Sequence, residues 1–262
     1  MLVLALDSSA TASVALARVH GSEAGASFDI LARFESEDTR SHAEVMAPFA
    51  HAALQEAGVR GEELDAILTG TGPGPFTGLR AGIVTARALG FAWSVSVYGM
   101  MSLTALAERA YQERIFAQGG GAGEAEGAEL LVASDARRRE VYSARYRVNA
   151  EGYSLVDGPT VSPASEILPG EGPSYAYGYG AGLYAETLRE LGWDLVEAGE
   201  GIHPHAEYLL AAAARRGLDA LSPDTSALYL RDSDAKIPAA MLARQQKQAA
   251  RATAQTVGQR EG

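Results

Sequence analysis

The stretch TGTGPGPFTGLRAGI, residues 69–83, places four glycines and two prolines ahead of a single arginine. A glycine-rich loop that leads into a helix is a common phosphate-binding device, because free backbone N–H groups and the helix dipole both attract an anion. Here no Lys-Ser or Lys-Thr pair follows the glycine at position 78, and Pro73 and Pro75 lack the N–H groups that a dinucleotide fingerprint needs. We therefore favour a rigid strand-to-helix connection, with Thr77 as N-cap, over a phosphate site.

The helix expected at 78–93 carries a stripe of small residues. Gly82, Ala86 and Gly90 recur every four positions, which places them on one side of the helix. A glycine inside a helix costs about 1 kcal/mol relative to alanine, and close approach of another backbone is the usual compensation. Two interpretations stay open: the stripe packs inside its own lobe, or it meets a helix of another subunit.

The apolar runs and polar turns in the rest of the sequence predict an α/β protein. Apolar runs at 2–6 and 13–17 flank a polar turn, and runs at 130–134 and 140–148 flank another, so each half opens with a β-hairpin. Ser41 and the glutamate three residues later form a capping box, which predicts a helix in the first half. Two halves of this kind indicate two related lobes.

We expect the first lobe at 1–110 and the second at 111–239, with the last helix able to pack back on the first lobe. The glycine-rich segment at 117–129 is expected to be a surface loop. The polar segment at 240–262 has no apolar face and is expected to be a disordered tail.

Composition argues against several function classes. The 262 residues are 47% apolar and carry a net charge of −11, whereas a protein that binds nucleic acid alone is usually basic. The sequence has no cysteine, so it has no disulfide, no thiolate metal ligand and no thiol nucleophile. The N-terminal segment does not resemble a signal peptide, and no apolar run is long enough to span a membrane. We therefore expect a cytoplasmic protein without membrane contact.

Candidate ligand-binding residues are few. Asp7, Ser8 and Ser9 lie in the first hairpin turn, where a carboxylate could meet a magnesium-bound nucleotide, although turns favour aspartate in any case. Gly178 and Gly180 could let the backbone approach an adenine ring, or could simply form a turn. The five histidines show no pair spaced for a metal. No catalytic constellation can be assembled, and we expect no metal and no cofactor beyond weak ATP binding.

Six motifs between residue 2 and about residue 236 carry a resemblance to a known family: LALDSSATASVAL, SHAEVMAPFAHAAL, GTGPGPFTGLRAGIVTARALGFA, DARRREVY, YGYGAGLY and ALYLRDSDAK. They resemble the TsaB (YeaZ) family of bacterial tRNA threonylcarbamoyladenosine biosynthesis proteins, and the block that begins at Gly70 is the most specific of them. The resemblance implies two lobes of the actin/Hsp70/sugar-kinase (ASKHA) fold, each ribonuclease-H-like.

The resemblance also implies a role. The family is similar to TsaD, the subunit that transfers the threonylcarbamoyl group to adenosine 37 of tRNAs reading ANN codons. Met101 and Ala105 stand where TsaD carries its metal-binding histidines. This implies a non-catalytic paralogue that pairs with TsaD, supports the ATPase TsaE through the complex, forms a homodimer when alone and meets tRNA only indirectly.

In the family, the helix that follows Ser41 and the helix at 78–93 form the partner surface. The resemblance therefore assigns the interface to Ser41, Met46, Phe49, Ala50, Leu79, Gly82, Ile83, Ala86 and Gly90. Two alternatives remain: an active small-molecule kinase of the same superfamily, and, less favoured, a glycoprotease-like peptidase. A kinase needs a general base, and the glycine loop offers no aspartate.

Overall fold

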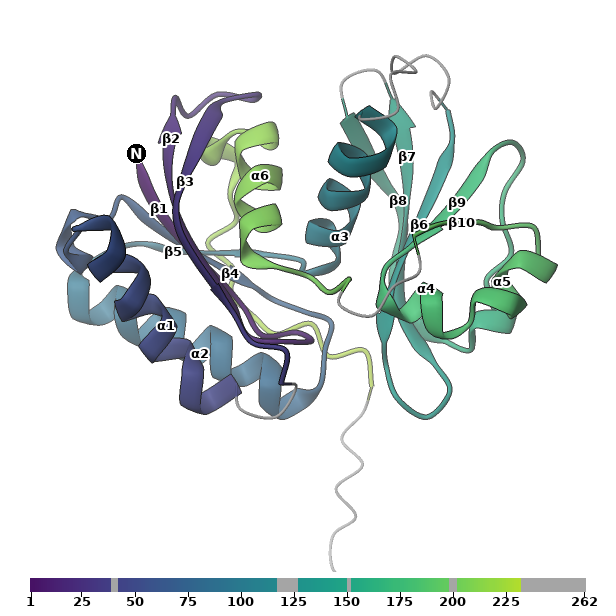
Figure 1. Ribbon diagram of the computed structural model, residues 1–262, viewed down its shortest axis with the longest axis horizontal. Coiled ribbons are helices and arrows are strands. Elements are labelled where there is room, and N and C mark those ends of the chain that lie inside the picture. The colour runs from purple at the N-terminus through teal and green to yellow at the C-terminus, as the bar shows by residue number, and fades with distance from the viewer. Residues whose placement is uncertain (39–41, 117–126, 150–151, 198–201, 232–262) are drawn as a thin grey trace, which may run out of the picture. The chain divides into compact units, whose positions relative to one another are not determined.

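The chain folds into two five-stranded mixed sheets, each with helices packed on it (Figure 1). The computed structural model describes residues 1–38, 42–116, 127–149, 152–197 and 202–231 of the 262-residue chain. The expected N-cap Ser41, most of the glycine-rich segment and the expected tail at 240–262 lie outside these residues. Among the described helices, none is long and apolar enough to cross a lipid bilayer.

The first sheet is built around an antiparallel meander. β1 pairs with β2 and β2 with β3, while β4 and β5 run parallel to β1, which gives the order β3-β2-β1-β4-β5. Residues 3–6 of β1 are all fully buried, because helices cover both faces of the sheet. The strands are β1 (Leu2–Asp7), β2 (Ser13–His20), β3 (Ser27–Glu35), β4 (Ala66–Gly70) and β5 (Val97–Met100).

Helices α1 (His42–Ala57) and α2 (Phe76–Trp93) cover one face of this sheet, and α6 (Ala206–Arg216) covers the other (Figure 1). Leu4 and Leu6 of β1 pack with residues of α1 and α2 in one apolar cluster. The alternate residues of β1 pack with α6 in a second cluster. The first lobe is therefore assembled from the N-terminal hundred residues together with a helix from the far end of the described chain.

Helix α2 begins two residues earlier than the sequence predicts. Its N-cap is Pro75, and the expected N-cap Thr77 already lies in the first turn. Proline is well suited to this end of a helix, because it has no N–H group that would be left without a partner there.

The second sheet repeats the topology of the first. Its order, β10-β9-β6-β7-β8, is that of the first sheet read in the opposite direction, with β6 in the place of β1. β6 and β7 form the antiparallel hairpin that the sequence predicts, and β9 runs parallel to β6. The prediction of two related α/β lobes is thus confirmed. The strands are β6 (Glu129–Asp135), β7 (Val141–Asn149), β8 (Gly152–Ser162), β9 (Ser174–Tyr177) and β10 (Asp194–Glu197).

The helices of the second sheet are shorter. Helix α3 packs in one apolar cluster with residues of β6, β7 and β9, and α4 packs with the other side of β6. The remaining elements are α3 (Leu103–Ala110), α4 (Tyr179–Leu183), α5 (Ala185–Glu190), the 3-10 turns η1 (Gly61–Glu63), η3 (Ala164–Glu166) and η4 (Leu218–Ala220), and the π-helical segment η2 (Tyr111–Phe116).

A buried polar network joins α3 to α6. Glu108 of α3 has no exposed surface, and its carboxylate accepts hydrogen bonds from Arg215 Nε at 2.8 Å and Nη2 at 2.6 Å. Tyr153 Oη and Gln112 Nε2 donate to the same carboxylate at 2.8 and 2.7 Å. Helix α3, which ends at the lobe boundary expected at residue 110, contacts both the second sheet and α6. These contacts do not assign α3 to one lobe, so that boundary stays a prediction.

Candidate functional site

The glycine loop packs on the turn between β1 and β2. A Cβ at Gly70 would strike the Asp7 carboxylate, and one at Gly74 would strike the backbone of Ser9. A Cβ at Gly78 would lie 3.1 Å from the carbonyl oxygen of Ser8, closer than most real contacts. The glycines are therefore needed because the loop lies directly against a neighbouring backbone. The space where a phosphate would bind is filled by the protein's own turn, as expected for a structural connection.

Asp7 is the buried centre of this arrangement. Its Oδ1 accepts hydrogen bonds from Ser9 N at 2.8 Å and Ser9 Oγ at 2.6 Å, and the residue has no exposed surface. Burial raises the pKa of Asp7 above its usual value, against the lowering effects of the Ser102 and Ser9 hydroxyls and of His42. Asp7 and Ser8 are both buried and do not face solvent, and their contact with a nucleotide stays a prediction.

Gly178 and Gly180 also face the protein interior. A Cβ at Gly178 would lie 2.5 Å from the carbonyl oxygen of Ala133, and one at Gly180 would lie 2.6 Å from the carbonyl carbon of Ser134. These glycines let α4 approach β6 closely, and the structure favours the turn interpretation over an adenine site.

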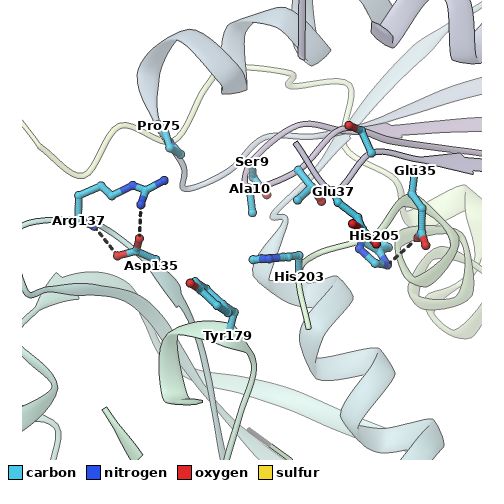
Figure 2. A pocket seen from close by; sticks show the side chains of 12 residues that line it. Ser9, Ala10, Glu35, Glu37, Pro75, Asp135, Arg137, Tyr179, His203 and His205 are labelled. Atoms are coloured by element: carbon cyan, nitrogen blue, oxygen red, sulfur yellow. Dashed lines mark hydrogen bonds and ion pairs between the residues drawn. The ribbon is translucent and has the colours of Figure 1, made fainter. Parts of the chain in front are cut away.

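Of the turn residues, Ser9 lines a cavity of about 630 Å³ (Figure 2). Arg137 and Asp135 line another part of it and form an ion pair of 3.1 Å. Tyr179 and His203 also line it, and their ring centroids lie 4.8 Å apart. The sequence proposed a possible nucleotide cleft from the Asp7–Ser9 turn and the segment around Gly178 and Gly180. Ser9 and Tyr179, which lies between those two glycines, line this cavity.

The charge of this cavity disfavours a polyphosphate. Three carboxylate side chains, Glu35, Glu37 and Asp135, line it against one arginine. Burial, together with the nearby His205 and Arg109, lowers the pKa of His203 to about 4, so His203 is neutral near pH 7. A nucleoside triphosphate would meet more negative than positive charge here.

Metal ligands are not grouped in the part of the chain that the structure describes. No three His, Cys, Asp or Glu side chains there lie close enough together to hold a metal ion. The Ser9 hydroxyl, the cavity's first candidate nucleophile, donates its hydrogen bond to buried Asp7. Ala105 is fully buried, and Met101 packs against the apolar cluster of α3.

The predicted interface residues lie mostly inside the first lobe. A Cβ at Gly82 would strike Ser8 Oγ, one at Gly90 would strike the Val97 side chain, and Ala86 has no exposed surface. The small-residue stripe therefore packs against its own sheet, which corrects its assignment to a partner surface. The same correction applies to the other buried members of the set, Met46, Ala50, Leu79 and Ile83. Phe49 is partly buried and stacks on Phe34 with a centroid distance of 5.8 Å.

The opposite side of α2 is exposed and apolar. Phe76 is 50% exposed, Val84 61% and Phe91 90%, and their spacing of eight and seven residues places them on one side of the helix. Arg80 lies between the first two, with its guanidinium carbon 3.6 Å from the Phe76 ring centroid. Its Nε donates to Tyr229 Oη at 2.7 Å. We call Phe76, Arg80, Val84 and Phe91 the outer face of α2.

The spacing of apolar residues in the sequence indicates the outer face of α2, which the motifs alone did not predict. Large apolar side chains recur at 76, 84 and 91, on the side of the helix away from the small residues. A helix with apolar residues on both sides has one side left to cover after it packs on its sheet. Exposed apolar side chains grouped in this way are typical of a protein–protein contact.

Comparison with known protein families supports the resemblance found in the motifs. The family model described as "TsaD: tRNA N6-adenosine threonylcarbamoyltransferase" matches residues 29–176. An uncharacterized protein of Mycobacterium tuberculosis is 42% identical over 133 residues, which are 51% of this chain and 54% of that protein. The chain thus matches about half the length of this curated relative.

Two further relatives match almost end to end. The tRNA threonylcarbamoyladenosine biosynthesis protein TsaB of Escherichia coli is 27% identical, with 91% of this chain and 99% of that protein covered. The crystal structure of YeaZ from Pseudomonas aeruginosa superposes with a TM-score of 0.66 and 31% identity, covering 87% of this chain and 99% of that one. With the two-lobed fold and the extent of these matches, the chain belongs to the TsaB/YeaZ family.

Proposed function

We propose that the chain is a non-catalytic subunit of the cytoplasmic machinery that makes threonylcarbamoyladenosine in tRNA. The observation that carries the proposal is the outer face of α2, which presents two aromatic rings, a valine and an arginine to solvent. Aromatic and arginine side chains are enriched among the residues that dominate binding energy at protein interfaces. The name of the Escherichia coli relative supports the pathway.

The partner we propose is a TsaD-type transferase. This chain lacks a catalytic constellation in the part that the structure describes, so the chemistry has to come from another subunit. A TsaD-type protein shares the family model and would present equivalent helices, so that α1 and α2 could pack on their counterparts in a four-helix contact. The same face would form a homodimer when the transferase is absent, and TsaE would associate through the complex.

The experiment is reconstitution with the TsaD and TsaE proteins of the same organism. We expect a complex with TsaD on size-exclusion chromatography, and threonylcarbamoylation of an ANN-reading tRNA only when this chain is added. The chain alone should show neither transferase nor peptidase activity. Robust modification by TsaD and TsaE without this chain would contradict the proposal.

Substitutions on the outer face test the surface itself. The double variant Val84→Asp, Phe91→Asp removes apolar area from exposed positions, so it should fold normally but lose TsaD binding and homodimerisation. The matched control is Val156→Asp, Leu168→Asp in the second lobe, where the two side chains are 48% and 62% exposed. If the control loses the partner and the α2 variant keeps it, the contact lies elsewhere.

A kinase is the second candidate, and the burial of Asp7 counts against it. Phosphoryl transfer needs a carboxylate that reaches the metal-bound nucleotide, and the Asp7 carboxylate is enclosed by the glycine loop. Titration with ATP and Mg²⁺, followed by thermal shift, separates the two functions. The unfolding temperature of a non-catalytic subunit should change little on addition of ATP and Mg²⁺. The unfolding temperature of a kinase should rise with nucleotide concentration until its site is saturated.

A further inference from the structure

The turn between β6 and β7 has an unusual backbone. Arg137, Arg138 and Arg139 have φ angles of 60°, 55° and 65°, so three consecutive arginines adopt the left-handed conformation. Glu140 N donates to the carbonyl oxygen of Arg137 at 3.0 Å, and Ala136 N donates to the carbonyl oxygen of Glu140 at 3.0 Å. These hydrogen bonds close a tight hairpin with Arg138 and Arg139 at its two central positions.

Arginine is a poor choice for those two positions. A two-residue hairpin turn with positive φ at both central residues favours an asparagine followed by a glycine. Glycine has no Cβ to approach the carbonyl oxygen in the left-handed region, and the short asparagine side chain can hydrogen-bond locally. The backbone alone would therefore be more stable with these smaller residues in place of Arg138 and Arg139. Turn geometry does not explain the arginines.

The arginines also concentrate charge. All three side chains are exposed, in a chain whose net charge is −11. Arg137 pairs with Asp135, whereas Arg139 forms no ion pair with any described residue. Other arginines, such as Arg33 and Arg215, are paired with a glutamate. The turn is thus a local basic site on an otherwise acidic protein.

We infer that the turn at 137–139 binds the phosphodiester backbone of RNA, and that it is this chain's own contact with the tRNA of the proposed complex. The inference rests on the proposed function. The planar fork of an arginine binds two phosphate oxygens at once, which makes arginine the preferred residue for such contacts.

The test exploits the conflict between turn geometry and charge. The double variant Arg138→Asn, Arg139→Gly removes two charges and relieves the backbone, so its unfolding temperature should rise by a few degrees. In the reconstituted complex, the KM for tRNA should rise by about tenfold with kcat nearly unchanged, because backbone contacts contribute to binding. The slope of log K for tRNA against log salt concentration should fall by about 2, one for each arginine lost.

Two controls isolate the turn. Arg138→Lys, Arg139→Lys keeps the charges, and should retain most of the tRNA affinity and the full salt slope. Arg18→Asn removes an exposed charge from β2 and should leave the KM unchanged. If the Arg138→Asn, Arg139→Gly variant keeps the wild-type KM for tRNA and the wild-type salt slope, the inference is overturned and the proposed function stands. If an acidic protein partner, and not tRNA, loses affinity, the inference is equally wrong. A wild-type complex that fails to modify tRNA removes the proposed function and the inference together.

Discussion

The backbone N–H of Gly82 donates a hydrogen bond to Ser8 Oγ at 2.9 Å and so fastens helix α2 to the turn between β1 and β2. The same hydroxyl donates to the carbonyl oxygen of Gly78 at 2.7 Å. One serine thus bridges two turns of the helix, and a Cβ at Gly82 would occupy its place. This side of α2 is therefore used within the lobe.

Ala86→Leu is expected to weaken folding more than association. Ala86 has no exposed surface and packs in the cluster formed by β1, β2, α1 and α2, so the added carbon atoms would overpack it and cost about 1–3 kcal/mol. Urea denaturation monitored by circular dichroism measures the loss. Ala88→Leu, at an exposed position on the same helix, should leave the free energy of unfolding nearly unchanged.

Asp7→Asn is expected to stabilise the protein at neutral pH. Burial raises the pKa of Asp7 in the folded state, so its contribution is favourable below the unfolded value near 3.8 and is lost as pH rises through the folded value. The asparagine removes this loss, and its Oδ1 can still accept the Ser9 hydrogen bonds. Melting temperatures between pH 4 and 8 should show an advantage that shrinks toward acid. Asp194→Asn, an exposed control, should show none.

His203→Phe is expected to reduce sensitivity to acid. Burial lowers the pKa of His203 to about 4, so the neutral folded form is favoured above the unfolded value of 6.5 and stability is lost as pH falls between the two values. Phenylalanine keeps the ring beside Tyr179 without titrating. Part of the wild-type loss will persist, because burial also lowers the pKa of His205. An exposed control, His51→Phe, should melt with the wild-type pH dependence.

Arg215→Met is expected to destabilise the protein strongly. It leaves the fully buried Glu108 carboxylate without its counterion, a change that typically costs about 3–5 kcal/mol. The hydrogen bonds from Tyr153 and Gln112 place the effect toward the lower end of that range. The double variant Glu108→Gln, Arg215→Met should recover part of the loss in urea denaturation. Additive losses would show that the pair is not coupled.

Local patterns were enough to predict the hairpins and the two related lobes. The alternation of apolar runs and polar turns depends only on residues close in sequence, and it predicted β1–β2 and β6–β7 correctly. Asp7, expected in the first turn, is the last residue of β1 and directly precedes that turn. Its burial could not be predicted, because it depends on Gly70, which the fold brings against it from another strand.

The prediction of which side of α2 faces a partner failed for a related reason. A stripe of small residues has the same helical period whether it faces a sheet or a partner, so the sequence cannot distinguish the two. Ser8, which lies far from α2 in the sequence, occupies the space beside Gly82, and Val97 of β5 occupies the space beside Gly90. The left-handed turn at 137–139 was likewise unpredictable, because its arginines oppose the local preference.

The position of α6 constrains the order in which the protein can form during synthesis. All strands of the second sheet lie between residues 129 and 197, so that lobe can fold as one continuous segment. The packing of the first sheet is complete only after α6 has been synthesised, since Leu209 and Leu210 complete the apolar cluster that buries Val3 and Ala5. On the ribosome, the half that is made first is therefore the half that is finished last, and until then one face of its sheet is open to chaperones and proteases.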